Sequence, residues 1–425
     1  MRILKLTDAL EKSLLRTRHE RDRRAERIAA GIIADIRKRG DVALAAWAQK
    51  LDGVDLRRNG VWISQREIRA ASKQVSPDFL RALRHAATNI RRVAEKQLPR
   101  PWSLEVERGV KISQHVQAIE AIGCYIPGGR FALISSLLMT VVPAQVAGVP
   151  QITVVCPRPN VELLAAASLL GVTRIGRIGG AQAIAALAYG TRNVARVDKI
   201  FGPGNRFVTA AKQLISGDCA IDLPAGPTEA LVVAANGNAK WIAADLLAQA
   251  EHAPDAGSFL VTPSHRLARA VQEEVQEQLA NLPAENSAHS SMRKTGAILL
   301  APSLEAACVF SNRFAPEHLS LPHNPAALLK KIRAAGTIFF GPWGAQPLGD
   351  YISGSNHVLP TGGWARMRGG LSAADFVKCI SVQNIDGAGF RGVADDAVRL
   401  ARAEGLLAHA NAVEIRMTNS KEARS

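Results

Sequence analysis

The sequence predicts an α/β fold with two Rossmann-like lobes, each an incomplete doubly wound sheet, plus a helical N-terminal region and a small helical C-terminal tail. Three observations lead to this class. The chain has 425 residues, enough for more than one core. Its hydrophobic content is 47% with only 5% aromatic residues, the usual profile of an α/β enzyme. Short apolar runs alternate with helical patterns in two successive series, as parallel sheets require.

The N-terminal region, residues 6–98, is predicted to be helical. Apolar positions recur there at helical spacing among many charges, as in Ile28, Ile32 and Ile36. Pro99 and Pro101 end this region, because proline interrupts regular helix.

The first alternating series follows. Strands are predicted at residues 119–124, 151–156, 174–178 and 199–201, with helices at 161–170, 181–188 and 206–215. The most apolar run, residues 131–149, is interrupted by Ser135, Pro143 and Gly148. It therefore predicts a buried helix and a turn, and not a membrane span.

The second series has predicted strands at residues 231–234, 258–262, 298–300 and 337–340, and helices at 241–251 and 266–279. The tail from about residue 371 is predicted to be helical, with too few apolar residues for a core of its own. We therefore expect it to pack on the body or on a partner subunit. The predicted domains are an N-terminal arm at 1–20, a discontinuous main α/β domain at 21–124 and 228–371, a second Rossmann-like domain at 125–227, and the tail at 372–425.

The net charge of +16 is concentrated partly in residues 16–24, where acids interrupt a basic run. A nucleic-acid footprint and a solvated helix face are the two interpretations. No aromatic residues are interleaved with this run and no groove-binding motif accompanies it, so the sequence favours the solvated face and no nucleic-acid partner. A positive field would also attract an anionic dinucleotide.

The five cysteines are scattered, odd in number and without a Cys-x-x-Cys pair. This pattern argues against a disulfide framework or a structural zinc knot and favours a reducing compartment. The start lacks an apolar signal core, because Asp8, Glu11 and Lys12 follow the first residues at once. The expected location is cytoplasmic, without membrane association.

The most informative residues are the adjacent Glu317 and His318. They follow Pro316, a natural first position of a short helix. A carboxylate can activate water and an imidazole can carry protons, as an enzyme that deprotonates an alcohol and then a hydrate requires.

Three other stretches carry polar groups that could complete such a site. Gln249 and His252 are three apart on a predicted helix that ends before Pro254, so an amide oxygen and an imidazole could face one metal ion. Asp350 and His357 flank a turn, and Glu404 and His409 lie on either side of a predicted helix end. Taken singly, each group is equally typical of a satisfied histidine, a structured loop or an exposed helix end.

Two glycine-rich stretches, residues 123–129 and 202–205, follow a predicted strand and precede a helix. Such turns bring backbone amides to a ligand at a helix N-terminus. A literal G-x-G-x-x-G also occurs at Gly387, Gly389 and Gly392. It does not follow the first strand of a βαβ unit, so we interpret it as a chance match.

In this order and spacing, the motifs resemble the histidinol dehydrogenases over nearly the whole chain from about residue 15. The segments that carry the resemblance are residues 125–129, 179–191, 198–205, 221–229, 243–252, 315–319, 349–361 and 404–409. The resemblance implies a homodimer whose C-terminal tail reaches across to the partner. Glu404 and His409 could then serve the neighbouring active site.

The resemblance also implies a role for each matching residue. One zinc ion per subunit would be held by Gln249, His252, Asp350 and His409. Glu317 and His318 would form the acid–base pair. Substrate contacts would come from Thr228, His357 and Glu404 together with His318 and the four metal ligands. NAD would be contacted by Tyr125, Gln182 and Asn205, without the usual glycine fingerprint.

The implied reaction is the oxidation of L-histidinol to L-histidine by two hydride transfers to two NAD molecules, the last steps of histidine biosynthesis. His318 would take the hydroxyl proton, and Glu317 would activate the water that hydrates the aldehyde intermediate. Thr228 stands where many family members have serine; its hydroxyl remains, but its methyl group narrows the pocket.

Other functions stay open at this point. A family relative could oxidise a different small alcohol, such as a sulfonated diol, with the same zinc and NAD chemistry. His357 and Glu404 favour histidinol, because a sulfonate would prefer cationic partners. A zinc hydrolase that uses Glu317 to activate water is a more distant alternative, as is a basic binding module without catalysis.

Overall fold

The computed structural model describes residues 1–18, 22–128, 133–224, 226–323 and 326–422. Part of the predicted N-terminal arm, and Gly129 and Ala225 from the matching motifs, lie outside these ranges. The chain forms two compact units. One comprises Met1–Gln97 with Ile119–Phe376, and the other Leu98–Ala118 with Val377–Ser425. The first unit holds two parallel sheets covered by helices, which confirms the predicted fold class.

The N-terminal region is helical after a first strand, β1 (Arg2–Lys5). Its helices are α1 (Asp8–Thr17), α2 (Arg23–Arg39), α3 (Asp41–Trp47), α4 (Leu56–Asn59), α5 (Gln65–Ala71) and α6 (Pro77–Gln97), with a π-helical turn, η1, at Ala48–Asp52. Thr7, Asp22 and Ser64 cap α1, α2 and α5, since each side chain accepts a hydrogen bond from a backbone N–H of the first turn.

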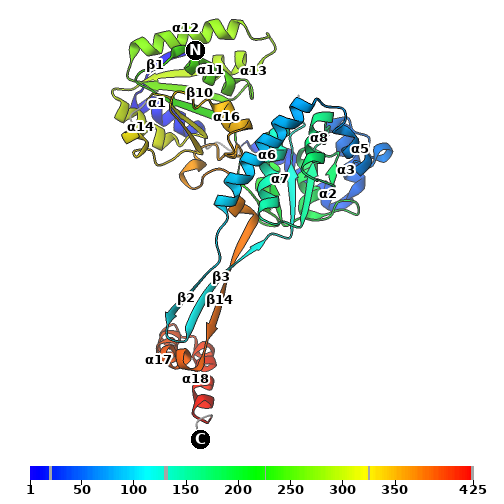
Figure 1. Cartoon of the computed structure of the whole chain (residues 1–425), viewed down its shortest axis with the longest axis vertical. Coiled ribbons are helices and arrows are strands. Elements are labelled where there is room, and N and C mark those ends of the chain that lie inside the picture. The colour runs from blue at the N-terminus through cyan, green and yellow to red at the C-terminus, as the bar shows by residue number, and fades with distance from the viewer. Residues whose placement is uncertain (19–21, 129–132, 225, 324–325, 423–425) are drawn as a thin grey trace. The chain divides into compact units, whose positions relative to one another are not determined.

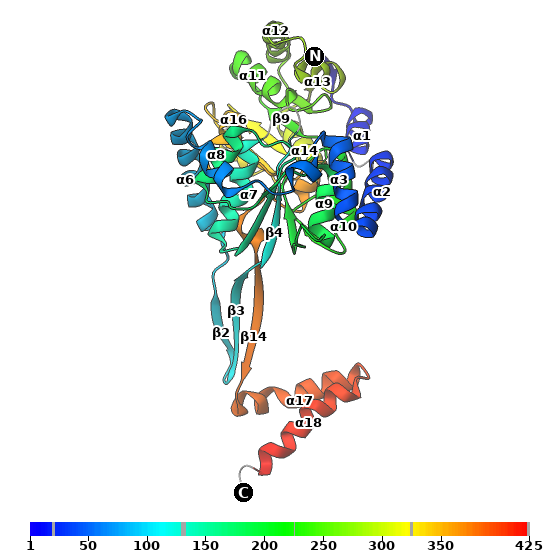
Figure 2. The ribbon, with the colours of Figure 1, turned by 90° about the vertical axis from the view of Figure 1, so that its right-hand side faces the viewer.

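A five-stranded parallel sheet has the order β6-β5-β4-β7-β8. Its strands are β4 (Ala121–Tyr125), β5 (Gln151–Val155), β6 (Ile175–Gly176), β7 (Lys199–Phe201) and β8 (Ala220–Ile221). The connecting helices are α7 (Ile134–Val146), α8 (Val161–Leu169), α9 (Gly180–Tyr189) and α10 (Arg206–Ile215). Figure 2 shows α9 and α10 on one side of β4 and α7 and α8 on the other. The chain winds outward in both directions from β4 and β7, so these neighbours mark a topological switch point.

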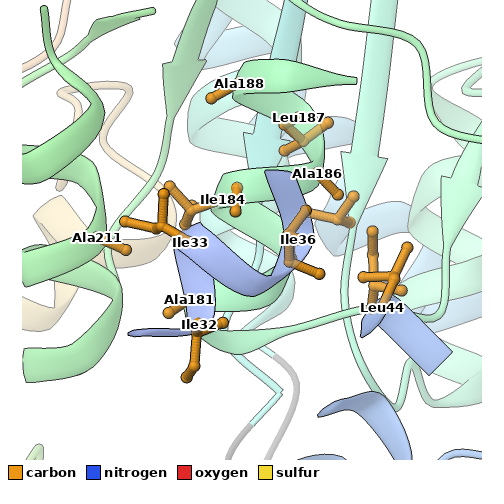
Figure 3. Close-up of a cluster of buried hydrophobic side chains, with 14 of the residues drawn as sticks. Ile32, Ile33, Ile36, Leu44, Ala181, Ile184, Ala186, Leu187, Ala188 and Ala211 are labelled. Atoms are coloured by element: carbon orange, nitrogen blue, oxygen red, sulfur yellow. The ribbon is translucent and has the colours of Figure 1, made fainter. Parts of the chain in front are cut away.

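Helix α2 packs on helices α9 and α10, which cover this sheet, through its apolar stripe. Ile32, Ile33 and Ile36 are buried with Ile184 and Leu187 of α9 (Figure 3). Full burial of one such side chain contributes about 1.5–3 kcal/mol relative to exposure. The apolar residues of α2 recur every 3.6 residues because they lie on the side of the helix that this contact buries.

A six-stranded parallel sheet has the order β1-β11-β10-β9-β12-β13. Its further strands are β9 (Glu229–Val233), β10 (Gly257–Thr262), β11 (Ala297–Leu300), β12 (His318–Leu321) and β13 (Thr337–Phe340). Helices α11 (Ala239–Ala250), α12 (His265–Ala280) and α13 (Ser287–Lys294) cover one face, while α1 and α14 (Leu304–Phe314) cover the other (Figure 1). Short helices α15 (Ala326–Leu329) and α16 (Gln346–Tyr351) and 3-10 turns at Trp364–Arg366 and Ala373–Phe376 follow. The switch point here lies between β9 and β12.

The second unit corrects the prediction for the tail. Strand β14 (Val377–Ile385) pairs antiparallel with β3 (Val110–Ala118), which pairs antiparallel with β2 (Trp102–Glu107). The tail is therefore not wholly helical. Helices α17 (Gly387–Ala403) and α18 (Leu407–Glu422) follow. The glycines of the G-x-G-x-x-G match lie in the first turns of α17 behind an antiparallel strand, so they belong to no βαβ unit.

The buried helix predicted at residues 131–149 corresponds to α7, in which Ser136 to Ala144 are all buried. Within the part of the chain that the structure describes, no helix has the length and apolar character needed to cross a membrane. The predicted domain boundaries stay a prediction.

Candidate active site

His318 begins β12 and Glu317 directly precedes it, so the pair does not lie at the start of a helix. The prediction of a helix after Pro316 is therefore wrong. Helix α14 ends at Ala315, whose backbone is left-handed (φ 49°, ψ 67°), and the chain then turns into the sheet. His318 pairs with Ala230 of β9. The pair thus lies at the amino ends of the two strands at the switch point.

The Glu317 carboxylate is buried and held by two donors. The Thr228 hydroxyl donates to Oε2 at 2.5 Å, and the Glu229 backbone N–H donates to the same oxygen at 2.9 Å. Burial raises the pKa of Glu317, although the neighbouring His318 and these two hydrogen bonds oppose the shift. A carboxyl group whose pKa is raised in this way suits a general base that takes a proton from water.

The His318 imidazole is buried, and its two ring nitrogens have different surroundings. Nδ1 lies 3.4 Å from the Glu229 carbonyl oxygen and 3.6 Å from Glu317 Oε2. Nε2 has no hydrogen-bond partner among the described residues. A proton on Nδ1 faces the acceptors, so Nε2 keeps its lone pair for a proton from elsewhere.

Two carboxylates outweigh the effect of burial on His318. Burial lowers the pKa of the imidazole. Glu317 and Asp350 raise that pKa by more than burial lowers it, so the net shift is upward. The nearest Asp350 oxygen is 3.8 Å from Nε2, too far for a direct hydrogen bond. A buried ring nitrogen without a partner is uncommon, and it marks the position where a substrate hydroxyl could bind.

A chain of amides and hydroxyls orients Glu317. Gln249, buried in the last turn of α11, donates from Nε2 to the Thr228 hydroxyl at 2.7 Å. Gln346 donates to Gln249 Oε1 at 2.5 Å. An amide oxygen has two lone pairs, so Gln249 Oε1 can also accept a metal ion.

His252 lies just beyond α11 and not on it, because the helix ends at Ala250 with Glu251 as its cap. The predicted placement of both side chains on one helix is corrected accordingly. His252 Nδ1 lies 3.0 Å from the Ala248 carbonyl oxygen. A proton on Nδ1 would bond that carbonyl and leave Nε2 as the nitrogen that can bind a metal.

Asp350 supplies a carboxylate from the last turn of α16. Burial raises its pKa, but the imidazoles of His318 and His357 outweigh this effect, so the pKa of Asp350 is lowered. Its backbone carbonyl faces His357 Nδ1 at 3.0 Å, and His357 Nε2 lies 3.2 Å from the Ser136 hydroxyl. Burial lowers the pKa of His357, which favours the neutral ring.

The donor set suits zinc, which accepts mixed nitrogen and oxygen ligands. Among the described residues, no three His, Cys, Asp or Glu side chains gather into a group that could hold a metal ion. A metal ion bound here would therefore need the amide of Gln249 and one further donor beside His252 and Asp350. Glu404 and His409 belong to the second unit, where Glu404 caps α17, Gly405 has φ 76° and His409 lies on α18. The predicted helix end between them is confirmed.

The three predicted dinucleotide contacts lie at the carboxyl edge of the five-stranded sheet. Tyr125 ends β4, and its hydroxyl accepts from the Gly180 N–H at 3.1 Å. Gln182 on α9 donates to Asp52 at 2.8 Å, while its Oε1 is buried without a hydrogen-bond partner among the described residues. Asn205 caps α10, because its Oδ1 accepts from the N–H groups of Phe207 and Val208.

A buried ion pair, Lys212 with Asp222, holds the turn at residues 202–205 in place. Gly202 has φ 114°, and a Cβ there would lie 2.1 Å from the Tyr125 carbonyl oxygen, so only glycine fits. The buried Lys212 donates to the Gly202 carbonyl at 2.8 Å and pairs with Asp222, which accepts from the Gly202 N–H at 2.8 Å. Such close approach of backbones at a switch point is typical of a nucleotide-binding crevice.

The two sheets offer opposite polarity at these edges. The C-terminus of α11, with Gln249 in its last turn, leads back to the amino edge of the six-stranded sheet, and carbonyl groups there favour a cation. The N-termini of α9 and α10 lie at the carboxyl edge of the five-stranded sheet, where N–H groups favour an anion.

Several residues that support the site were not predicted from the sequence. Glu229 begins β9 and is buried; an acid at the head of the apolar run Ala230–Val233 was the available signal. Arg18 was hidden within the basic run of residues 16–24, yet it is largely buried and pairs with Glu229. Gln346 carried no recognisable sequence signal.

Comparison with known proteins bears on this arrangement. The family model described as histidinol dehydrogenase matches residues 15–417. This chain belongs to the histidinol dehydrogenase family. The histidinol dehydrogenase of Aquifex aeolicus is 45% identical over 91% of this chain and 91% of its own length. That of Rhizobium meliloti is 44% identical over 96% of each chain.

A crystal structure of histidinol dehydrogenase from Elizabethkingia anophelis matches with a TM-score of 0.93 at 36% identity, over 100% of this chain and 99% of that one. The resemblance inferred from the motifs is thereby confirmed. The chain is accordingly an enzyme, an oxidoreductase of the histidinol dehydrogenase class.

Proposed function

We propose that this enzyme oxidises L-histidinol to L-histidine in two successive NAD-linked steps, with one zinc ion per subunit. The observation that supports it most strongly is the buried His318 Nε2, which has no hydrogen-bond partner among the described residues and lies beside the Glu317 carboxylate. Family membership supplies the substrate class.

In the first step, His318 Nε2 would take the hydroxyl proton of the alcohol, and NAD, when bound, would supply the acceptor for the hydride of the carbinol carbon. The raised pKa of His318 strengthens it as a base, and Glu317 and Asp350 stabilise the imidazolium that forms. The aldehyde is then hydrated. Glu317 takes a proton from the attacking water, while the Thr228 hydroxyl and the Glu229 N–H hold the carboxylate in position.

Zinc would be held by Gln249, His252, Asp350 and His409, and it would orient the amine and imidazole of the substrate as a template. The donors described above fit this metal. Gln249 Oε1 keeps a free lone pair, and His252 Nδ1 faces a carbonyl that fixes the ring for binding through Nε2. His357, Thr228 and Glu404 would contact the substrate. Tyr125, Gln182 and Asn205 would contact NAD.

A homodimer with exchanged C-terminal tails is part of this proposal. The three-stranded sheet of the second unit exposes large apolar side chains, among them Trp102, Leu104 and Val106 on β2. Exposed apolar groups gathered on one element are typical of association surfaces. A cytoplasmic location is also proposed. All five cysteines are free, in keeping with a reducing compartment.

The test is production of NADH by the zinc-loaded enzyme with histidinol, histidinal and a sulfonated diol compared side by side. We expect oxidation of histidinol and histidinal, with two NADH formed per histidinol. Preference for the diol would show that the enzyme oxidises a different alcohol with the same zinc and NAD chemistry. Hydrolysis of an ester or amide without NADH formation would point to a zinc hydrolase instead.

A further inference from the structure

We propose that Arg18 is a positioning residue for the Glu317–His318 pair, acting through Glu229 and through the turn at Ala315. This inference rests on the proposed function, because it assigns Arg18 to the acid–base pair named there. Arg18 follows α1, and its side chain is only 10% exposed. A buried arginine far from the pair in the sequence requires an explanation, because arginine is seldom buried unless it is paired.

The guanidinium of Arg18 binds Glu229 through two parallel hydrogen bonds. Nε donates to Oε2 at 2.9 Å, and the second donor, Nη2, contacts Oε1. This bidentate geometry fixes the direction of the carboxylate as well as its distance, which a lysine cannot do. Glu229 is 7% exposed, so solvent screens the pair only weakly.

The same guanidinium also holds the turn that precedes Glu317. Arg18 Nη1 donates to the carbonyl of Phe314, and Nη2 lies 3.4 Å from the carbonyl of Ala315. Its guanidinium carbon, Cζ, lies 3.6 Å from the centre of the Phe314 ring, a cation–π contact. Ala315 is the only non-glycine with a positive φ among the described residues. A strained backbone of this kind persists only where its surroundings hold it.

Glu229 connects Arg18 to both members of the pair. Its backbone N–H donates to Glu317 Oε2 at 2.9 Å, and its carbonyl oxygen lies 3.4 Å from His318 Nδ1. Arg18 therefore holds both strands at once: β9 through the Glu229 side chain, and the approach to β12 through two carbonyls. Without Arg18, the Glu229 carboxylate would lie buried without a cation and close to the Glu317 carboxylate.

The electrostatics agree with this geometry. Burial raises the pKa of Glu229 to about 7, the charge of Arg18 opposes that shift, and Glu317 adds to it. Removal of the cation would leave two buried carboxyl groups that repel each other. Glu317 would then lose its two-donor geometry or share a proton with Glu229, and either change weakens it as a base.

The test is a set of purified variants: Arg18→Met, Arg18→Lys, the double variant Arg18→Met/Glu229→Gln, and Arg177→Met as the control. Arg177 also binds a carboxylate with two hydrogen bonds, those to Glu67, and it contacts neither Glu229 nor Glu317. For each variant, kcat and KM for histidinol, histidinal and NAD are measured on protein that thermal unfolding shows to be folded at the assay temperature.

We expect Arg18→Met to lower kcat with histidinal at least 30-fold, while KM for histidinal and KM for NAD each change less than threefold. Arg18→Lys should restore little of the lost kcat, because lysine lacks the two parallel N–H donors of the guanidinium. The double variant should regain part of the lost kcat, because it removes the unpaired carboxylate. Arg177→Met should keep wild-type kcat. A crystal structure of Arg18→Met should show the Ala315 turn or the Glu317 carboxylate displaced.

Two results would overturn the inference while the proposed function stands. One is wild-type kcat in folded Arg18→Met, and the other is an equal loss in Arg177→Met. A wild-type enzyme that forms no NADH from histidinol would overturn the proposed function, and the inference with it.

Discussion

Replacement of Lys212 by methionine tests whether the buried ion pair under the turn at residues 202–205 holds that turn in place. The side chains of Lys212 and Asp222 are 3% and 0% exposed. Methionine keeps most of the apolar stem but removes the donor to Asp222 and to the Gly202 carbonyl. Asp222 would keep two backbone donors, from Gly202 at 2.8 Å and Leu223 at 2.6 Å.

Removing one partner of a buried pair typically costs about 3–5 kcal/mol, because the other charge is left uncompensated. The two remaining N–H donors of Asp222 place this case near the lower end, so we expect the free energy of unfolding to fall by ~3 kcal/mol. The double variant Lys212→Met/Asp222→Asn should recover part of that loss, since no buried charge remains. Because the turn carries Asn205, KM for NAD should rise several-fold in Lys212→Met, with a smaller change in kcat.

The assay is urea unfolding followed by tryptophan fluorescence, beside NADH kinetics. Lys331→Met is the matched control, because Lys331 pairs with Glu305 at 3.7 Å with side chains 52% and 63% exposed. Solvent-exposed pairs contribute little, so this variant should unfold at nearly the wild-type urea concentration. Equal stability of Lys212→Met and Lys331→Met, with an unchanged KM for NAD, would refute the reasoning.

Three further predictions concern the acid–base pair and the tail. Glu317→Gln should accumulate aldehyde, with histidinal oxidation slowed about 10²–10⁴-fold and histidinol oxidation to the aldehyde largely kept; equal loss of both steps in stopped-flow assays would contradict the division of labour. The raised pKa of His318 predicts that kcat falls as pH drops through a value above the usual ~6.5, since the protonated ring cannot act as a base. A pH profile with its acidic limb below that value would count against this. His409→Asn should purify with little zinc by metal analysis. Mixed with Glu317→Gln and allowed to exchange subunits, it should restore about a quarter of wild-type activity if tails are shared, because half the dimers are hybrids with one intact site each. No recovery would place His409 in the site of its own subunit.

Most strands of the two parallel sheets could be predicted from the sequence, because they are short apolar runs set between helices with clear periodicity. Strands β1, β8 and β12 were not predicted. The strands of the second unit, β2, β3 and β14 in Figure 1, were not predicted either. The hairpin of β2 and β3 had a usable signal: Trp102, Leu104 and Val106 alternate with polar residues ahead of Gly109, where φ is 81°. Strand β14 had none of comparable strength, because its partner β3 lies in a distant part of the chain.

The candidate site was predicted as residue types but not as geometry. Pro316 suggested a helix, yet Ala315 turns the chain into β12, and that outcome depends on pairing with β9. The burial of Arg18 could not be foreseen from its neighbours, since its partner Glu229 is distant in sequence. The ligand set, the dinucleotide contacts and the dimer remain proposals, because each depends on atoms or chains beyond this one.

The direction in which strands run also bears on how so basic a protein could retain the proposed zinc ion. A net charge of +16 repels a divalent metal at long range, but at physiological ionic strength salt screens that repulsion at distances beyond about 8 Å. At contact distance the carbonyl end of α11 and the Asp350 carboxylate would outweigh the remaining repulsion. If zinc binds there as proposed, its uptake should therefore be slower in dilute buffer than in salt, as stopped-flow measurement with a zinc indicator would show.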